Sequence, residues 1–313
     1  MYPVAGPNRD WLLSAMDTYR RTAIVLRYWC DMTIAMAAFA GPSKIVTVSD
    51  ARLSYNEMVP AEDAATMKSR QIARKWGLMF AAEDSTAFTP LVEKAVRQLS
   101  DNGKGNPDPN HSYADVSKVV QVEYEKEFAE RFFREHLARF GYANIAEFRQ
   151  SGFTEMGKDL YHQYAMQLAK FDLGLELLGY GFGRGGTGYI FEVANPGKII
   201  SHNLRGFAAI GSGSLMALAA LNRKPKSTGG AETIYRLLDA KFSSETARDV
   251  GKKTYVITLC ADGEVRIMKQ GAVENIRRIW DEAQKQPSPI EAMEIIENDT
   301  VYSTRAKKTD DPA

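Results

Sequence analysis

Two short apolar segments joined by a tight turn constrain the fold of this chain more than any other sequence feature. Residues 33–39 and 44–50 each have the length and composition of a buried β-strand, and Gly41-Pro42 lies between them. The pair therefore predicts a β-hairpin. Thr33 begins the first strand, and the second ends at Asp50, two residues before Arg52. A hydroxyl, an acid and a base at the open end of a hairpin indicate a site.

The composition excludes several kinds of partner and compartment. The chain of 313 residues is 44% hydrophobic and 25% charged, and its formal net charge is +1, which gives no global attraction to nucleic acid or to an anionic membrane. No apolar run approaches the roughly 18 residues that span a bilayer, and residues 23–26 are too short for the core of a signal peptide. Cys30 and Cys260 form neither a disulfide framework nor a zinc set. We expect a cytoplasmic protein.

The order of the predicted elements indicates an α+β protein. Ser112 and Asp115 form a capping-box pattern, and from Val116 an apolar residue recurs every four positions, so a long helix is expected to reach about residue 140. Further helices are expected at 89–99, 143–149, 156–171, 215–222 and 231–242, and further strands at 76–82, 173–179, 188–193, 254–260 and 265–268, with one ending near 210. Such blocks predict layered sheets with helices outside rather than a doubly wound sheet.

The chain also divides into predicted regions. One domain is expected at 32–281, with a polar loop at 53–67. Residues 282–313 are polar and contain prolines, which predicts a disordered tail. Three interpretations of residues 1–31 are open: an N-terminal extension packed on the domain, a removable pro-segment, or sequence upstream of the true start.

Three segments give the chain a resemblance to the proteasome-type N-terminal-nucleophile (Ntn) hydrolases, and among them to the bacterial proteasome-like beta subunits. They are residues 33–52, 206–214 and 247–259, and the similarity covers roughly 32–270. Their order and spacing are more specific than any one of them. The resemblance implies a four-layer αββα sandwich and assembly into a homo-oligomeric ring. The segment from about 100 to 170 is longer than the corresponding region of an ordinary proteasome subunit and resembles a helical elaboration of that fold.

The resemblance also implies a catalytic set. Thr33 matches the nucleophile, which acts once processing makes it the first residue, because its free α-amine then takes the hydroxyl proton. The unperturbed pKa of an α-amine, about 7.7–8.0, suits that task, whereas an internal threonine has only an amide nitrogen. Asp50 would orient the hydroxyl, Lys68 would favour its deprotonated form, and the backbone N–H near Ala82 would serve the oxyanion. The remaining members of the polar network would be Ser212 and Asp249.

The chain departs from the family pattern around this set. The serine that usually follows the second aspartate is missing after Asp249, which also suits a plain loop residue. Alanine stands at Ala82, where the family usually has glycine. The spacing from Asp50 to Lys68 is longer than usual, so Lys75 is an alternative for the lysine.

The residue before the threonine is a further departure. Self-cleaving proteasome subunits have Gly-Thr at the cut, but here Met32 precedes Thr33. Methionine before a small residue is removed from new chains by methionine aminopeptidase. We therefore expect that translation from Met32 would expose Thr33 without self-cleavage.

Ordinary structural roles would also explain these residues. A threonine at the start of a strand, such as Thr33, is often only a β-former. Asp50 and Arg52 could form a surface pair in a turn. Lys68 lies in a basic stretch that suits a solvated face, and Ser212 suits a helix N-cap.

Other motifs are rejected. Residues 181–186 match G-x-G-x-x-G, but a strand is expected after them, where a dinucleotide site needs a helix. The basic residues 223–226 form a short loop rather than a nucleic-acid face. The histidines have no ligand spacing, so neither a metal nor another cofactor is expected; they are His111, His136, His162 and His202.

The leading hypothesis from the resemblance is a threonine-type hydrolase that cleaves peptide bonds within a homo-oligomeric ring. One rival is a catalytically silent subunit whose fold is kept for assembly. The other is an amidase for a small molecule, because the wider superfamily uses this nucleophile on many substrates. The expected partners are a peptide or protein substrate and further copies of the chain. The sequence does not identify a partner ATP-dependent unfoldase.

Overall fold

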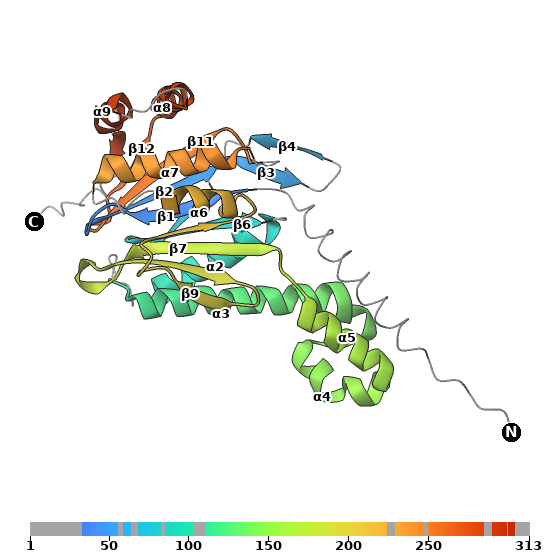
Figure 1. Ribbon diagram of the computed structural model, residues 1–313. Coiled ribbons are helices and arrows are strands. Elements are labelled where there is room, and N and C mark those ends of the chain that lie inside the picture. The colour runs from blue at the N-terminus through green and yellow to red at the C-terminus, as the bar shows by residue number, and fades with distance from the viewer. Residues whose placement is uncertain are drawn as a thin grey trace, which may run out of the picture. The chain divides into compact units, whose positions relative to one another are not determined.

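The predicted hairpin lies inside a six-stranded antiparallel sheet (Figure 1). Strands β1 (Ala35–Phe39) and β2 (Lys44–Asp50) pair in register, with Ala35 opposite Ser49. The sheet order is β10-β1-β2-β11-β12-β13, so the neighbours of the hairpin come from the far end of the sequence. These neighbours are β10 (Phe207–Ile210), β11 (Thr254–Cys260), β12 (Val265–Met268) and β13 (Thr300–Ser303).

A second antiparallel sheet has five strands in sequence order. They are β5 (Ser69–Ala73), β6 (Trp76–Ala82), β7 (Leu175–Phe182), β8 (Gly188–Ala194) and β9 (Lys198–Ser201). A separate two-stranded hairpin is formed by β3 (Arg52–Tyr55) and β4 (Val59–Asp63). The computed structural model describes residues 33–55, 59–63, 68–82, 85–102, 110–223, 229–246, 250–284, 290–298 and 300–303, all of which belong to one unit, Met32–Ala313.

Both faces of the central strands are buried, because successive side chains in a strand point to opposite faces. Ala35 and Ala37 of β1 pack against the second sheet, in one cluster with Met79 of β6. Met36 and its alternate neighbours pack on the other face, in a cluster with the helices. This two-sided burial explains why β1 is a continuous apolar run and why apolar residues occur on both faces of β2.

Helices cover the outer face of each sheet (Figure 1). The six-stranded sheet is covered by α6 (Ser214–Arg223), α7 (Gly230–Ser244), α8 (Gln270–Ala283) and α9 (Ile290–Asn298). The five-stranded sheet is covered by α2 (Phe88–Asn102), which follows the 3-10 turn Ser85–Ala87, and by α3 (Tyr113–Phe132). Among the described helices, none has the length and hydrophobicity needed to cross a membrane.

The start of α3 confirms the capping box. The Ser112 side chain accepts a hydrogen bond from the Asp115 N–H, and the Asp115 carboxylate accepts one from the Ser112 N–H. Val116, Val120 and Tyr124 of the predicted stripe are buried against the five-stranded sheet. The helix continues as a π-turn (Phe133–Leu137) and a 3-10 turn (Ala138–Phe140), so the predicted end near residue 140 is confirmed.

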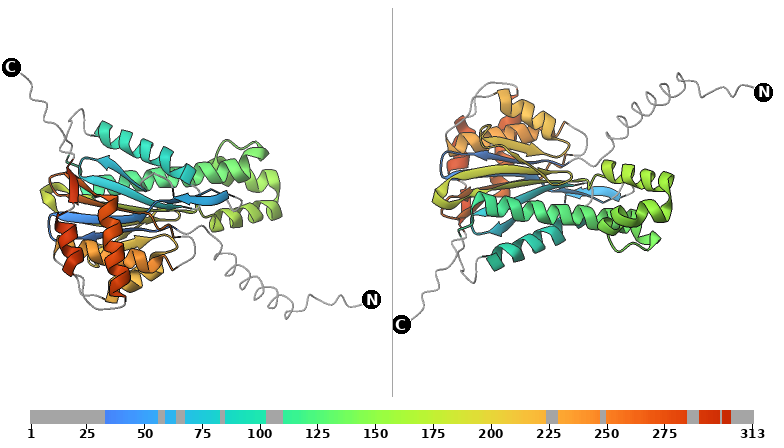
Figure 2. Two further views of the ribbon diagram at one scale, coloured as in Figure 1. Left: turned by 90° about the horizontal axis from the view of Figure 1, so that it is seen from above. Right: turned by 90° about the horizontal axis from the view of Figure 1, so that it is seen from below.

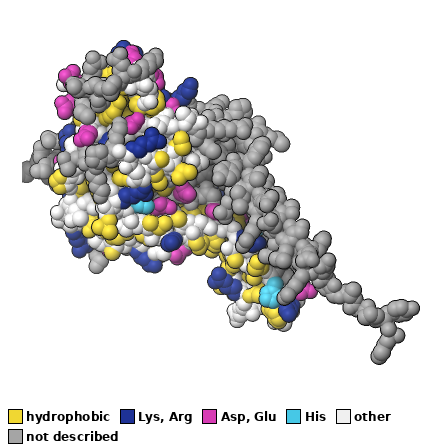
Figure 3. Space-filling model, in the orientation of Figure 1, with side chains coloured by type: hydrophobic (Ala, Val, Ile, Leu, Met, Phe, Trp, Pro, Cys, Tyr) yellow, Lys and Arg dark blue, Asp and Glu magenta, His cyan; other side chains and the backbone are white. Residues whose placement is uncertain are grey.

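A smaller helical cluster follows α3. Helices α4 (Ile145–Met156) and α5 (Lys158–Lys170) form their own core around Phe148 and Tyr164, at one end of α3 (Figure 2). Hydrophobic side chains are exposed on this pair, including Phe153 and Met166, and yellow atoms gather there in Figure 3. The predicted helices at 143–149 and 156–171 are therefore confirmed, the first being longer than expected.

The α+β class with antiparallel sheets is confirmed, but three local expectations need correction. The polar loop expected at 53–67 contains most of the β3–β4 hairpin. Part of the tail expected to be disordered is folded, because α9 buries Ile296 in the core and β13 pairs with β12. Helix α8 was not predicted, although its buried residues Ala272, Val273, Ile276 and Ile279 have helical spacing. Residues 1–31 lie outside the described residues.

Candidate functional site

Asp50, the last residue of β2, is the centre of the candidate site. Its side chain is fully buried, and its Oδ1 accepts hydrogen bonds from the Thr33 hydroxyl (3.1 Å), the Ile34 N–H (3.1 Å) and the Lys68 ammonium (2.7 Å). Its Oδ2 accepts one from the Gly251 N–H (3.1 Å). A buried carboxylate needs such partners, because its desolvation is otherwise unfavourable.

Sheet pairing brings these groups together. Asp50 lies opposite Thr254 at the start of β11, and the next residue, Ala51, donates its N–H to the Lys253 carbonyl (3.0 Å). Thr33 precedes β1 and therefore lies at the same open end of the hairpin. The alternative of a surface pair between Asp50 and Arg52 is wrong for Asp50, which is 0% exposed.

Thr33 is 6% exposed and is held on three sides. Besides the hydroxyl bond to Asp50, its backbone N–H donates to Ser212 Oγ (3.1 Å), and its carbonyl accepts from the Gly213 N–H (3.4 Å). Gly211 has φ +88°, and a Cβ there would lie only 2.3 Å from the Thr33 carbonyl oxygen. The turn between β10 and α6 therefore needs glycine at this position so that Ser212 can approach Thr33.

Lys68 is the lysine that reaches Asp50. It lies just before β5 and is 1% exposed, so the interpretation as part of a solvated basic face is wrong for it. The alternative, Lys75, lies in the turn between β5 and β6, where its carbonyl accepts the Phe182 N–H. Lys68 therefore lies at the edge of the five-stranded sheet, whereas Asp50 belongs to the six-stranded sheet. The ion pair between them connects the two sheets at this end.

The other two predicted residues have different outcomes. Ala82 ends β6, and the neighbouring Ala81 side chain lies 3.0 Å from where a Gly211 Cβ would stand, so this strand end adjoins the Thr33 turn. The use of the Ala82 N–H for an oxyanion stays a prediction. Asp249 lies outside the described residues; the first described contact to Asp50 after it is the Gly251 N–H.

Several residues near the site were not predicted. Lys241 of α7 is fully buried and donates to the Gly251 carbonyl and to the Glu245 carboxylate. Burial lowers its pKa to about 8; Glu245 and Asp50 oppose that shift, and Arg277 adds to it. The available signal was a lysine at an apolar position of α7, four residues after the buried Leu237.

Glu176 of β7 was also missed. Its carboxylate accepts the Gly211 N–H (2.6 Å) and therefore supports the turn that holds Thr33. Desolvation raises the pKa of this carboxyl, although the bond from Gly211 acts in the opposite direction. No local sequence pattern marks this residue, because Glu176 and Gly211 are 35 positions apart, one in β7 of the five-stranded sheet and the other in the turn after β10 of the six-stranded sheet.

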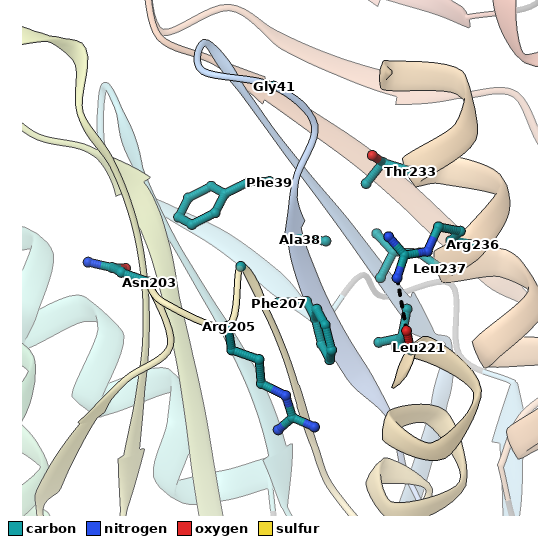
Figure 4. Close-up of a pocket in the computed structure, with 11 residues that line it drawn as sticks. Ala38, Phe39, Gly41, Asn203, Arg205, Phe207, Leu221, Thr233, Arg236 and Leu237 are labelled. Carbon is teal, nitrogen blue, oxygen red and sulfur yellow. Dashed lines mark hydrogen bonds between the residues drawn. The ribbon is translucent and has the colours of Figure 1, made fainter. Parts of the chain in front are cut away.

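A cavity of about 280 Å³ lies away from this group, near the other end of β1 (Figure 4). Its walls include Phe39, Phe207 and Leu237, and Arg236 donates to the Leu221 carbonyl at its edge. None of the described residues that line it belongs to the predicted catalytic set.

Among the described residues, one group has side-chain atoms spaced closely enough to hold a metal ion. It consists of Cys260, Asp262 and Glu264 at the β11–β12 turn, with ligand atoms within 4.8 Å of one another. Glu264 is already paired with Arg266 (2.8 Å), and Asp262 accepts the Glu264 N–H, so local contacts account for the arrangement.

The sequence matches no protein-family model and no curated protein.

Proposed function

We propose that this protein is a threonine-type hydrolase of amide bonds, with Thr33 as its N-terminal nucleophile. One observation carries the proposal: the Thr33 hydroxyl and the Lys68 ammonium meet on the same oxygen of the buried Asp50. Ser212 adds a partner on the Thr33 nitrogen, although it is 179 residues away in the sequence. These are four of the residues that the resemblance to proteasome-like Ntn hydrolases selected.

The arrangement suits a nucleophile that supplies its own base. Once Thr33 is the first residue, its neutral α-amine would take the hydroxyl proton while Oγ1 attacks the substrate carbonyl carbon. The C–N bond would then break, the proton would pass to the departing amine, and water would hydrolyse the resulting ester. Lys68 would stabilise the developing negative charge on Oγ1, and Asp50 would hold both groups in place.

The packing of the two sheets and the outer helices supports the finer assignment to the four-layer αββα sandwich of this family. Helices cover one face of each sheet, and the remaining faces meet in a shared core. The α4–α5 pair would be the helical elaboration. Assembly into a homo-oligomeric ring and peptide or protein substrates belong to the same proposal.

The test uses a chain produced to begin at Met32, with removal of Met32 verified by intact mass. An epoxyketone reacts with both the hydroxyl and the free amine of an N-terminal threonine, so we expect it to add once to this chain. Thr33→Ala should abolish the addition and Thr33→Ser should retain it. Thr47→Ala is the matched control, because Thr47 is a buried threonine of β2 whose hydroxyl donates to the Ile257 carbonyl (3.4 Å).

The outcomes separate the competing functions. Labelling that survives Thr33→Ala would refute the assigned nucleophile. If the chain that begins at Thr33 is not labelled at all, the catalytically silent subunit is favoured, and the missing serine after Asp249 already points in that direction. Labelling at Thr33 without cleavage of a peptide library would instead favour the small-molecule amidase.

A further inference from the structure

Lys241 occupies a position where a lysine is rare. It lies on the face of α7 that packs against the six-stranded sheet, and its exposure is 0%, like that of its neighbours Leu237, Leu238 and Ala240. Burying an ammonium is strongly unfavourable unless every donor has an acceptor. The contacts of this side chain therefore indicate what keeps it there.

The Lys241 ammonium has three acceptors. It donates to the carbonyls of Gly251 and Lys252 and to the Glu245 carboxylate. Three acceptors match the three hydrogens of a protonated lysine. Glu245 also receives both arms of Arg277 (2.5 and 2.6 Å), and Arg277 donates to the Lys252 carbonyl (2.8 Å). Lys241 and Arg277 thus both hold the backbone carbonyls of residues 251–252. The Glu245 carboxylate accepts from both cations and orients them.

The same backbone segment holds the catalytic aspartate. The Gly251 N–H donates to Asp50 Oδ2 (3.1 Å), while the Gly251 carbonyl accepts from Lys241. Gly251 is therefore hydrogen-bonded to Lys241 through its carbonyl and to Asp50 through its N–H. Glycine has the freest backbone of all residues, so its N–H keeps its direction only if neighbouring groups restrain it.

The orientation of the Asp50 carboxylate depends on that N–H. The terminal torsion of an aspartate is broad, so contacts on its two oxygens set the plane of the carboxylate. Oδ1 accepts hydrogen bonds from the Thr33 hydroxyl, the Ile34 N–H and the Lys68 ammonium, whereas the described contact on Oδ2 is from the Gly251 N–H. If Gly251 moves, the carboxylate can turn and Oδ1 leaves the nucleophile.

We propose that Lys241 is a positioning residue for the nucleophile, acting through Gly251 on Asp50. The inference rests on the proposed function of Thr33. It assigns part of the site to helix α7, on the outer face of the six-stranded sheet.

The test measures epoxyketone labelling of the chain that begins at Thr33 as a function of probe concentration. For Lys241→Met we expect the maximal labelling rate to fall at least about 10-fold, because small misplacements of reacting groups have large effects. The half-saturating concentration should change less than about twofold. A purely structural role would reduce the amount of folded protein that is labelled, not the rate per labelled molecule.

Arg236→Met is the matched control. Arg236 is a buried cation on the same helix and also donates to a backbone carbonyl, that of Leu221 (2.9 Å), which is not connected to Asp50 by the described contacts. Its labelling rate should stay within about twofold of the unmodified chain. Equal rates for Lys241→Met and the unmodified chain would overturn the inference, and so would an equal fall in Arg236→Met.

Two further measurements cover other outcomes. If Lys241→Met does not fold, Arg277→Met removes only the second cation and should lower the maximal rate about threefold; an unchanged rate would overturn the inference. Hydrogen exchange of the Gly251 amide should accelerate at least about 10-fold in the folded variant, and unchanged protection would also overturn it. Absence of labelling in the unmodified chain refutes the proposed function instead, and the exchange result then still tests the restraint on Gly251.

Discussion

Replacing Asp50 and Lys68 together should destabilise the protein much less than the sum of the two single replacements. The two side chains are 0% and 2% exposed, and the ammonium lies 2.7 Å from the carboxylate. Asp50→Ala would leave the Lys68 ammonium without its buried counter-ion, and it would also leave the N–H groups of Ile34 and Gly251 without an acceptor.

The magnitudes follow from the burial. Loss of one partner of a buried ion pair costs about 3–5 kcal/mol, and an unsatisfied buried donor adds about 1–3 kcal/mol. We therefore expect about 5 kcal/mol for Asp50→Ala and about 4 kcal/mol for Lys68→Met. The double variant contains neither charge, so its loss should be about 5–6 kcal/mol rather than the sum of about 9, which gives a coupling of about 3–4 kcal/mol.

The assay is equilibrium urea unfolding, monitored by tryptophan fluorescence. It is applied to the four proteins of the double-mutant cycle: the unmodified chain, the two single variants and the double variant. Trp76 of β6 and Trp280 of α8 lie in different layers and report both sheets. Single effects that add in the double variant to within about 0.5 kcal/mol would refute the reasoning. That result would mean that the two charges are hydrated or separately satisfied in the folded protein.

Two other predictions concern Lys241 and Gly211. Burial lowers the pKa of Lys241 to about 8 from 10.5, so the unfolded chain binds the proton more tightly and the free energy of unfolding should rise with pH between these values. From about pH 7.5 to about pH 9.5 this increase in the free energy of unfolding is about 2 kcal/mol. It should be absent from Lys241→Met. Equal dependence of the unfolding free energy on pH in the two proteins would contradict the prediction. Gly211→Ala should destabilise by about 3 kcal/mol or more, because it combines φ +88° with a Cβ 2.3 Å from the Thr33 carbonyl oxygen. Gly185→Ala, at φ +82° with nothing within 4 Å, should cost only about 1–2 kcal/mol, and similar losses at both sites in urea unfolding would show that the contact with Thr33 is unimportant.

Local patterns predicted most of the elements because they depend on neighbouring residues alone. The hairpin strands, the capping box at Ser112 and the stripe from Val116 are all confirmed. The failures also have a physical basis. Strands β3 and β4 pair with each other in a separate two-stranded sheet, and their short polar segments lack the apolar runs from which the other strands were predicted. Among the α9 residues whose side chains are described, Ile296 is buried in the core and Ile295 packs against it, and two such neighbours are a weak signal in a polar segment.

The candidate site was predictable only in part. Thr33 and Asp50 are close because a hairpin joins them, and Ser212 lies in a recognisable glycine-serine turn. The choice between Lys68 and Lys75 could not be made from spacing, since it depends on how the second sheet lies over the first. The roles of Gly251 and Glu176 depend on single hydrogen bonds between distant strands and loops.

The sequence by itself determined the class of the fold and the hairpin, and it placed Thr33 and Asp50 at one end of that hairpin. Only the tertiary structure decided that Lys68 faces Asp50, that Gly251 holds the other carboxylate oxygen and that Lys241 lies behind it. The reason is the range of the interactions. Periodicity and turn chemistry act over a few residues, whereas the bond from Gly251 to Asp50 spans 201 positions and exists because β11 pairs with β2.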